Sequence, residues 1–247
     1  MKRIHLLATV LVVVFAVSCN FTEEMTIKED GSGRLSINFD GSELMGMAGD
    51  EIMKNNKEKP IDSLISFKDM LEEKKDSISQ LSPEDQAKLK KLEPFKMHMV
   101  MNPETKEMKF DLFSDFKDVN EVNDAFNAFQ SASLLGPNND QGNQPKLGGD
   151  APTTEVSYNF TGRTFSRTAK IIDEELFKQS VDSLQGAEMF LSGSTYTLKY
   201  HFPKRVKSAS AEGATFSADG KTLIYEVKFL DLMKDPSVLD LEVELEN

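Results

Sequence analysis

The sequence predicts an α+β fold in which antiparallel sheets built of hairpins carry amphipathic helices packed on one face. In several short segments apolar and polar residues alternate, which is the pattern of a half-buried strand. Between residues 42 and 92 the apolar residues instead recur at helical spacing, so we expect a helical insert after the first hairpin. The C-terminal part returns to strict alternation, which indicates further strands.

The first predicted element is a β-hairpin. Apolar residues alternate with polar ones on both sides of a short polar segment, at Met25, Ile27, Leu35, Ile37 and Phe39. Gly31 and Gly33 lie in that segment and suit a tight turn. Because the segment lacks the later carboxylates of a calcium loop, we interpret it as the hairpin turn.

Two or three amphipathic helices are predicted between residues 42 and 92. Apolar residues recur there at helical spacing among many Lys and Glu residues, at Leu64, Phe67, Leu71 and Ile78. Ser82 followed by Pro83 is typical of a helix N-cap with proline at the first helical position. The charged residues 72–75 are interpreted as a solvated helix face.

A second hairpin and a further helix are predicted next. The hairpin alternates apolar residues on either side of a turn at residues 102–106, at Met97, Met99, Met101, Met108, Phe110 and Leu112. We interpret this methionine row as a sheet face packed on helices, with a soft ligand surface or a thioether metal site as the alternatives. The helix carries Val119, Val122, Phe126 and Phe129, with Asp118 as its cap.

Residues 136–152 form the predicted boundary within the chain. They are rich in Pro, Gly, Asn and Asp, and Leu147 is their one large apolar residue, so we expect a flexible linker or loop. This divides the chain into a leader at residues 1–18, an α+β region at 19–135, the linker, and a second α+β region at 153–247. The sequence is compatible with two alternatives, in which the two regions form a single domain or two separate domains.

The second region is predicted to hold a strand, a helix and three C-terminal antiparallel strands. Val156, Tyr158 and Phe160 alternate in the first strand, and Asp173 opens the helix. The apolar positions of the three last strands are Tyr196, Leu198, Tyr200 and Phe202, then Leu223, Tyr225, Val227 and Phe229, then Leu239, Leu241, Val243 and Leu245. Asp219-Gly220 is interpreted as the turn into the second of these strands.

The first nineteen residues have the layout of a bacterial lipoprotein signal. Lys2 and Arg3 precede an apolar run at residues 6–17, which is shorter than the roughly 20 residues that a transmembrane helix needs. Small residues then precede Cys19, which is the single cysteine of the chain and so has no partner for an internal disulfide. We predict lipidation of Cys19. Ala16 stands where such signals usually carry Leu, and the alternatives are a plain cleaved signal peptide and a retained anchor.

This resemblance implies a cell-envelope protein held at a membrane through a lipid on Cys19. Asn20 lacks the aspartate that usually retains lipoproteins in the inner membrane, so the resemblance implies an outer-membrane address. The acidic pair Glu23-Glu24 resembles the surface-export signal of Bacteroidota lipoproteins, and the periplasmic and surface faces both stay open.

Charge and residue usage narrow the functions further. The formal net charge is −12, and the charged residues of the leader are both basic, so the remaining chain is more acidic still. This argues against a nucleic-acid partner, because that affinity depends on Lys and Arg contacts to phosphates. His98 and His201 occupy outward strand positions, and the sequence singles out no catalytic residue, no metal ligand set and no cofactor site. We therefore do not expect an enzyme.

Two stretches carry a resemblance to LppM-like lipoprotein domains and to uncharacterised Bacteroidota lipoproteins. Residues 196–206 and 216–225 follow a strand, proline, valine, turn and strand pattern, and residues 27–33 resemble the opening hairpin of that family. The resemblance implies an α+β envelope domain and transfers no catalytic residue. It leaves two hypotheses: a non-enzymatic lipoprotein that contacts an envelope protein or polysaccharide, and a carrier for an apolar ligand such as a lipid or glycolipid.

Overall fold

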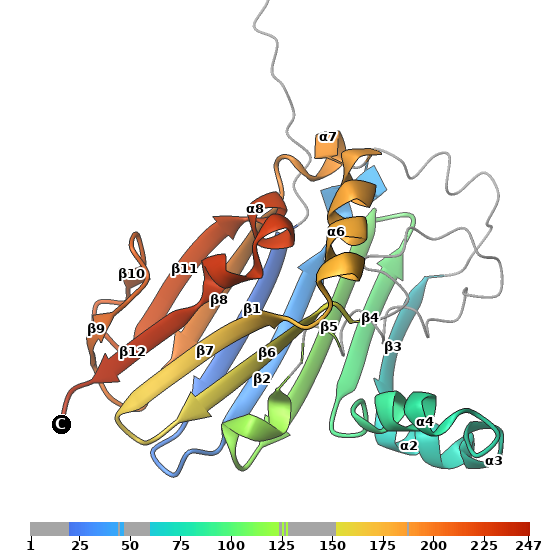
Figure 1. Ribbon diagram of the computed structural model, residues 1–247, viewed down its shortest axis with the longest axis horizontal. Coiled ribbons are helices and arrows are strands. Elements are labelled where there is room, and N and C mark those ends of the chain that lie inside the picture. Colours follow the sequence, from blue (N-terminus) through green and yellow to red (C-terminus); the bar gives the residue numbers. More distant parts are fainter. Residues whose placement is uncertain are drawn as a thin grey trace, which may run out of the picture.

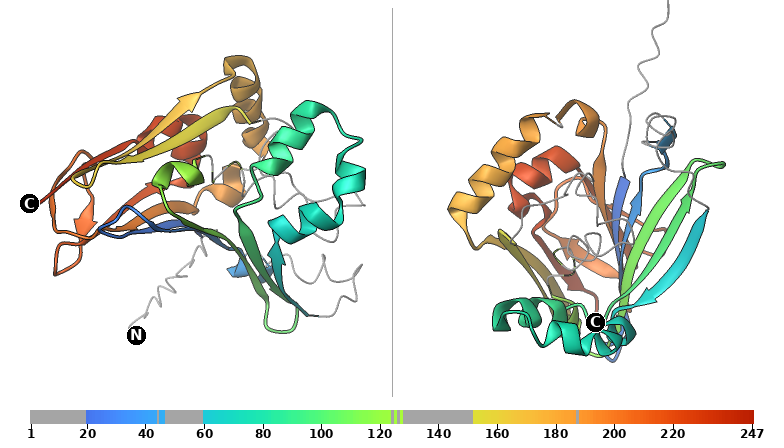
Figure 2. Two further views of the ribbon diagram at one scale, coloured as in Figure 1. Left: turned by 90° about the horizontal axis from the view of Figure 1, so that it is seen from below. Right: turned by 90° about the vertical axis from the view of Figure 1, so that its right-hand side faces the viewer.

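Two β-sheets that face each other form the body of the molecule in the computed structural model (Figures 1 and 2). The structure describes residues 20–43, 45–46, 60–123, 125, 127, 152–186 and 188–247. Cys19 and residues 136–151 of the expected linker lie outside this part of the chain. The predicted α+β class with mainly antiparallel strands is confirmed.

The larger sheet has eight strands in the order β10-β11-β8-β1-β2-β5-β4-β3. Along the chain they are β1 (Asn20–Ile27), β2 (Gly33–Asp40), β3 (Ile61–Ser66), β4 (Lys96–Asn102), β5 (Glu107–Phe116), β8 (Thr195–His201), β10 (Thr215–Phe216) and β11 (Thr222–Lys228). The predicted β1–β2 and β4–β5 hairpins are both present. Gly31 adopts a φ of 81° in the first turn, a backbone conformation that glycine tolerates without strain.

Strand β1 lies inside this sheet and joins the two halves of the sequence. It pairs antiparallel with β2 and parallel with β8, which is a strand from the C-terminal region. Regions 19–135 and 153–247 therefore contribute strands to one continuous sheet. Alternate residues of β1 are buried, namely Phe21, Glu23, Met25 and Ile27.

The smaller sheet has four strands in the order β6-β7-β12-β9. They are β6 (Thr154–Phe160), β7 (Thr164–Ile171), β9 (Val206–Ala209) and β12 (Leu241–Leu245). The three predicted C-terminal strands are present and have antiparallel partners, but they do not all lie in one sheet. Strands β8 and β11 pair with each other, but β12 pairs with β7 and β9 on the other side of the core. Alternation determines which residues face the core, whereas it does not determine which sheet a strand joins.

Short helices connect the strands. They are α2 (Phe67–Glu73), α3 (Lys75–Ile78), α4 (Pro83–Lys90), α6 (Glu174–Ser183), α7 (Glu188–Leu191) and α8 (Phe229–Lys234), with 3₁₀ turns η1 (Val119–Val122), η3 (Leu184–Gly186) and η4 (Pro236–Leu239). The expected N-caps are present, since Asp173 accepts from the Leu176 amide at 2.9 Å and Asp118 accepts from the Asn120 amide at 2.9 Å.

Four of the predicted helical or strand assignments need correction. Leu64 lies in the edge strand β3 rather than in a helix, and 64% of it is exposed. Phe229 begins helix α8, and Leu239 lies in η4. The helix expected from Val119 starts with the short 3₁₀ turn η1, while Phe126 and Phe129 lie outside the described residues.

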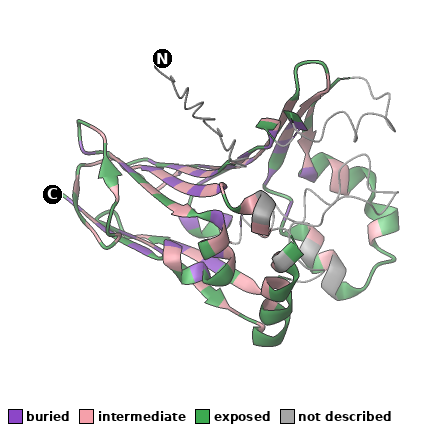
Figure 3. Ribbon diagram, turned by 90° about the horizontal axis from the view of Figure 1, so that it is seen from above, coloured by how far each residue is buried: buried purple, intermediate pink, exposed green. Residues whose placement is uncertain are grey.

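The core fills the space between the two sheets, and buried residues lie on strands that face each other (Figure 3). Aromatic rings dominate it: Phe21 stacks on Phe229 at a centroid distance of 4.5 Å, and Phe165 meets Tyr200 edge-on at 5.2 Å. Met97 belongs to this core and Met99 is also buried, which agrees with the interpretation of the methionine row as a packed sheet face.

Candidate functional site

A fully buried ionic cluster lies between the two sheets, and we call it the Glu23 cluster. Its members are Glu23 on β1, Tyr196 and Tyr200 on β8, Tyr158 on β6 and Arg167 on β7. Strand alternation explains why these side chains meet, because each of them occupies an inward-facing position of its strand. Their exposed fractions are between 0% and 2%, so no part of the cluster reaches the surface.

Five donor groups converge on the Glu23 carboxylate. The hydroxyls of Tyr158 and Tyr196 donate at 2.7 Å each, to Oε1 and Oε2 respectively, and the Tyr200 hydroxyl donates to Oε1. Arg167 donates from Nε to Oε1 and from Nη2 to Oε2, both at 3.3 Å. This two-pronged contact is the arrangement in which arginine binds a carboxylate most specifically.

The cluster ties the larger sheet to the smaller one. Glu23, Tyr196 and Tyr200 come from adjacent strands of the eight-stranded sheet, whereas Tyr158 and Arg167 are directly paired residues of the four-stranded sheet. Arg167 also donates from Nη1 to the Leu239 carbonyl at 3.4 Å. The ionic contact therefore links the two sheets through directional hydrogen bonds as well as through apolar packing.

Burial and charge move every pKa in the cluster away from neutrality. Burial by itself raises the pKa of the Glu23 carboxyl, but the positive charge of Arg167 and the hydrogen bonds to the carboxylate outweigh burial and leave that pKa lowered. Burial, together with the charge of Glu23, raises the pKa of the Tyr158, Tyr196 and Tyr200 hydroxyls well above the usual value. At neutral pH the cluster is thus an ionised carboxylate, a guanidinium and three neutral phenols, an arrangement suited to holding structure rather than to moving protons.

The adjacent glutamate lies on the opposite, outer face of β1. Glu24 Oε1 accepts from Lys199 Nζ at 3.0 Å and contacts His201 Nε2 at 2.8 Å, and its side chain is 35% exposed. His201 also contacts the Thr222 hydroxyl through Nδ1 at 3.0 Å. His98 Nε2 contacts Asp62 Oδ1 at 2.7 Å near the edge strand β3. Both histidines therefore lie at outward strand positions, as predicted.

One carboxylate on this outer face has an unsatisfied oxygen. Among the buried polar side-chain atoms that the structure describes, Asp111 Oδ1 alone has no hydrogen-bond partner. Burial raises the pKa of Asp111, and the charge of Glu24 adds to this, while Arg34 and His98 act in the opposite direction. Within the described ranges, no group of three or more His, Cys, Asp and Glu side chains is placed to hold a metal ion.

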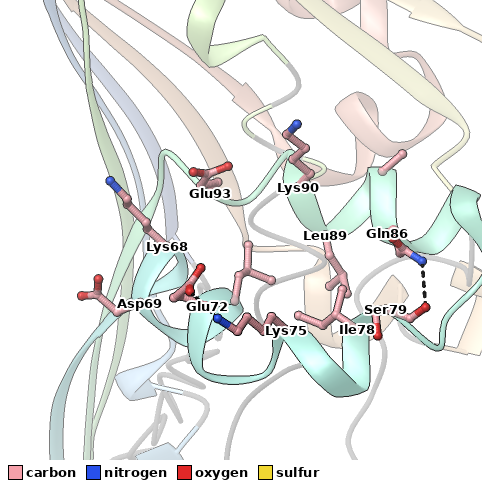
Figure 4. Close-up of a pocket in the computed structure, with 12 residues that line it drawn as sticks. Lys68, Asp69, Glu72, Lys75, Ile78, Ser79, Gln86, Leu89, Lys90 and Glu93 are labelled. Atoms are coloured by element: carbon pink, nitrogen blue, oxygen red, sulfur yellow. Dashed lines mark hydrogen bonds and ion pairs between the residues drawn. The ribbon is translucent and has the colours of Figure 1, made fainter.

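A surface groove of about 580 Å³ lies among helices α2, α3 and α4 (Figure 4). Leu71, Ile78 and Leu89 supply its apolar lining, and Leu89 points toward Ile78 across it. Its charged lining is balanced, with three lysines and three carboxylates at Lys68, Lys75, Lys90, Asp69, Glu72 and Glu93. Lys75 is already paired with Glu72 at 3.0 Å. The groove thus combines an apolar lining with charged residues whose formal charges cancel.

Of the residues singled out from the sequence, Cys19 lies outside the described residues, directly before Asn20 of β1. Sequence reasoning missed the Glu23 cluster and noted only that Glu23-Glu24 resembles an acidic surface-export signal. In the folded body Glu23 is fully buried and Glu24 is partly exposed. The available signal was the phase of Glu23, since it shares the apolar row of Met25 and Ile27. Strand β7, which carries Arg167, was not predicted.

The fold and the cluster define an α+β protein of two facing sheets joined by a buried ionic contact. The chain is similar in structure to the NMR structure of the folded domain of LppM from Mycobacterium tuberculosis, with 9% sequence identity and a TM-score of 0.40 over 94% of this chain and 91% of that chain. The likeness is one of fold and bears on no particular residue. The chain matches no family model and no curated protein sequence.

Among the described residues, no helix has the length and apolar character needed to cross a membrane.

Proposed function

We propose that this protein is a lipid-anchored cell-envelope lipoprotein with a non-enzymatic binding or structural role at the membrane surface. The observation that carries the proposal is the leader, in which a basic start, an apolar run at residues 6–17 and small residues precede the solitary Cys19. The folded body is compatible with it, because β1 begins at Asn20, the residue that follows Cys19 in the sequence.

The non-enzymatic role is favoured by the character of the buried polar groups. The Glu23 carboxylate is saturated by five donors and is out of reach of solvent, so it has no open position for a substrate. The outer face of the eight-stranded sheet carries polar side chains such as Thr22, Asn38 and Thr197 at outward positions. Such a face suits contact with an envelope protein or a polysaccharide.

A variant at position 19 tests the anchor. Cys19→Ala should remove incorporation of a labelled fatty acid and should release the protein from the membrane fraction, because the chain has no other cysteine. The folded body should keep the stability of the wild type, which thermal unfolding can verify. A Cys19→Ala variant that still partitions with membranes and incorporates the label would contradict the proposal.

A second variant tests the proposed outer-membrane address. Asn20→Asp introduces the residue that usually retains lipoproteins in the inner membrane. It preserves the fold, because the Thr195 hydroxyl donates to Asn20 Oδ1 at 3.2 Å and aspartate keeps that acceptor. In a diderm host we expect the lipidated protein to move from the outer-membrane fraction to the inner one, and an unchanged distribution would contradict the outer-membrane address.

The alternative function is a carrier for an apolar ligand such as a lipid or glycolipid, and the groove among α2, α3 and α4 favours it. Native mass spectrometry of the body purified from its own envelope distinguishes the two functions. The carrier function predicts a bound apolar molecule that is lost in Ile78→Lys. A ligand-free body that captures an envelope protein or polysaccharide favours the non-enzymatic surface role.

A further inference from the structure

The outer face of the four-stranded sheet carries a second surface groove, with a volume of about 590 Å³. Its lining comes from the adjacent strands β7, β12 and β9, and Figure 1 is seen from this side, with β7 and β12 in front of the larger sheet. Phe165 and Val243 are buried and Ala209 packs against the core, so their neighbours on each strand point outward. The outward side chains that line the groove are Thr164, Ser166, Ser208, Ser210, Glu242 and Glu244.

Strand register arranges these side chains as two parallel rows across the sheet. In the first row Glu242 is paired with Ser166 on β7, and its amide donates to Ser210 Oγ on β9 at 2.8 Å. The second row, two residues farther along β12, has the same composition: Thr164, Glu244 and Ser208. Each row thus places one carboxylate between two hydroxyls at roughly 4.8 Å per strand, and the rows are about 7 Å apart along the strands.

The two carboxylates of this groove differ in their counter-ions. Glu244 accepts from Lys207 Nζ at 2.8 Å and lies 3.7 Å from Arg163 Nη2, and the hydrogen bond from Lys207 lowers the pKa of its carboxyl. Glu242 is exposed and has no cationic partner in the described part of the chain. The lining residues include no lysine or arginine, and the whole chain has a formal net charge of −12, so an anionic ligand is repelled.

We propose that this groove binds a saccharide that carries a free amino group. The ammonium of the ligand pairs with the Glu242 carboxylate, which is the charged group of the groove that lacks a counter-ion. The ligand hydroxyls exchange hydrogen bonds with the serine and threonine hydroxyls, each of which can both donate and accept. An apolar ligand is disfavoured, because Phe165 and Val243 direct their side chains into the core rather than into the groove.

This inference adds a face and a ligand class to the binding role proposed above, and it does not depend on the lipid anchor. The groove volume lies within the range of small-molecule sites in proteins. Its chemistry also separates it from the groove among α2, α3 and α4, where leucine and isoleucine side chains supply the lining. The two grooves therefore suit different ligands.

Isothermal titration calorimetry of the purified full-length protein in detergent tests the proposal. The probe is a glucosamine oligomer at a pH where its amines are protonated, and an N-acetylglucosamine oligomer of equal length supplies the same hydroxyls without the charge. We expect Glu242→Gln to weaken binding of the glucosamine oligomer by about tenfold, which corresponds to the loss of one hydrogen bond to a charged group. Ser166→Ala should weaken binding of both oligomers several-fold, and thermal unfolding verifies that each variant is folded.

Glu155→Gln is the matched control, because Glu155 is an exposed residue of β6 in the same sheet but outside the groove lining. It removes the same charge, so the affinity for the glucosamine oligomer should stay within about twofold of the wild type. Equal weakening by Glu242→Gln and Glu155→Gln would show a general attraction to the acidic surface and would overturn the site.

Two further outcomes would overturn the proposal. An oligolysine that binds as tightly as the glucosamine oligomer and is insensitive to Ser166→Ala would show that the groove recognises a basic peptide instead. A wild-type protein that binds no glucosamine oligomer would show that the groove is not a saccharide site. Neither outcome affects fatty-acid labelling at Cys19, so failure of this inference is distinguishable from failure of the proposed anchor.

Discussion

Glu23 and Glu24 are the same residue type at neighbouring positions of β1, yet the fold places them in opposite environments. Glu23 faces the core with 0% exposure and receives five donor contacts from two sheets. Glu24 faces outward, is 35% exposed and contacts Lys199 and His201 on the neighbouring strand β8. The alternation of side chains along β1 therefore determines that Glu23 contacts both sheets and that Glu24 lies on the outer surface.

The two environments differ in how much the loss of one charge would lower the free energy of unfolding. A surface ion pair contributes about 0–1 kcal/mol, because solvent screens it and its side chains lose freedom. Removing one member of a buried pair leaves the other charge without compensation, at a penalty of about 3–5 kcal/mol. The contrast between Glu23 and Glu24 can thus be measured with matched substitutions on one strand.

The largest effect is expected for Glu23→Gln. This change leaves the buried Arg167 guanidinium without its counter-ion, so we expect the free energy of unfolding to fall by about 3–5 kcal/mol. Urea denaturation, monitored by circular dichroism, measures this decrease in the free energy of unfolding. Glu24→Gln is the matched control and should lower stability by no more than about 1 kcal/mol. Similar losses for both variants would contradict the contrast.

The second largest effect is expected for Arg167→Met, which should lower the free energy of unfolding by about 2–4 kcal/mol at neutral pH. It is smaller because Glu23, unlike Arg167, can become neutral by binding a proton. The variant also changes the dependence of stability on pH, which urea denaturation at several pH values measures.

In the wild type the pKa of Glu23 is lowered from its ordinary value by the charge of Arg167 and the hydrogen bonds, so its contribution to stability is present above the ordinary value and is lost as the pH falls through the lowered one. Without Arg167, burial raises the pKa of Glu23, and the stability of the variant should increase as the pH falls through that raised value toward the ordinary pKa of a glutamate. An Arg167→Met variant that loses stability on acidification as the wild type does would contradict this account of the cluster.

A smaller effect is expected for Tyr200→Phe. The substitution removes one hydroxyl that donates to the Glu23 carboxylate, and hydrogen bonds to charged groups contribute about 1.5–3 kcal/mol. Tyr225→Phe is the control, because Tyr225 is a partly buried tyrosine on β11 outside the cluster. We expect the thermal unfolding temperature of Tyr225→Phe to differ little from that of the wild type, whereas Tyr200→Phe should unfold at a lower temperature. A Tyr200→Phe variant as stable as Tyr225→Phe would show that the phenol contributes nothing to holding Glu23.

The sequence predicts local structure well in this chain. The two hairpins, the caps at Asp118 and Asp173 and the start of α4 at Pro83 all depend on residues within a few positions of each other. The outward positions of His98 and His201 also follow from alternation alone. These features need no knowledge of which strands become neighbours.

The sequence did not predict which strands from distant parts of the chain become neighbours. The parallel pairing of β1 with β8 and the transfer of β12 to the second sheet join residues far apart in the chain, and alternation is the same whichever partner a strand takes. The Glu23 cluster depends on both. Its acidic member looks like a surface residue in a polar sequence context, and Arg167 becomes its partner only when β7 packs over β1. The phase of Glu23 within an apolar row is the one local sign of the cluster.

The central claim is that Glu23 and Arg167 act as one buried unit that joins the sheets, whereas Glu24 and Lys199 form a surface contact. A pair of double-mutant cycles tests it most directly, with Glu23→Gln and Arg167→Met in one cycle and Glu24→Gln and Lys199→Met in the other. We predict a coupling free energy of about 2–3 kcal/mol for the buried pair and less than about 1 kcal/mol for the surface pair. Equal coupling in the two cycles would contradict the claim.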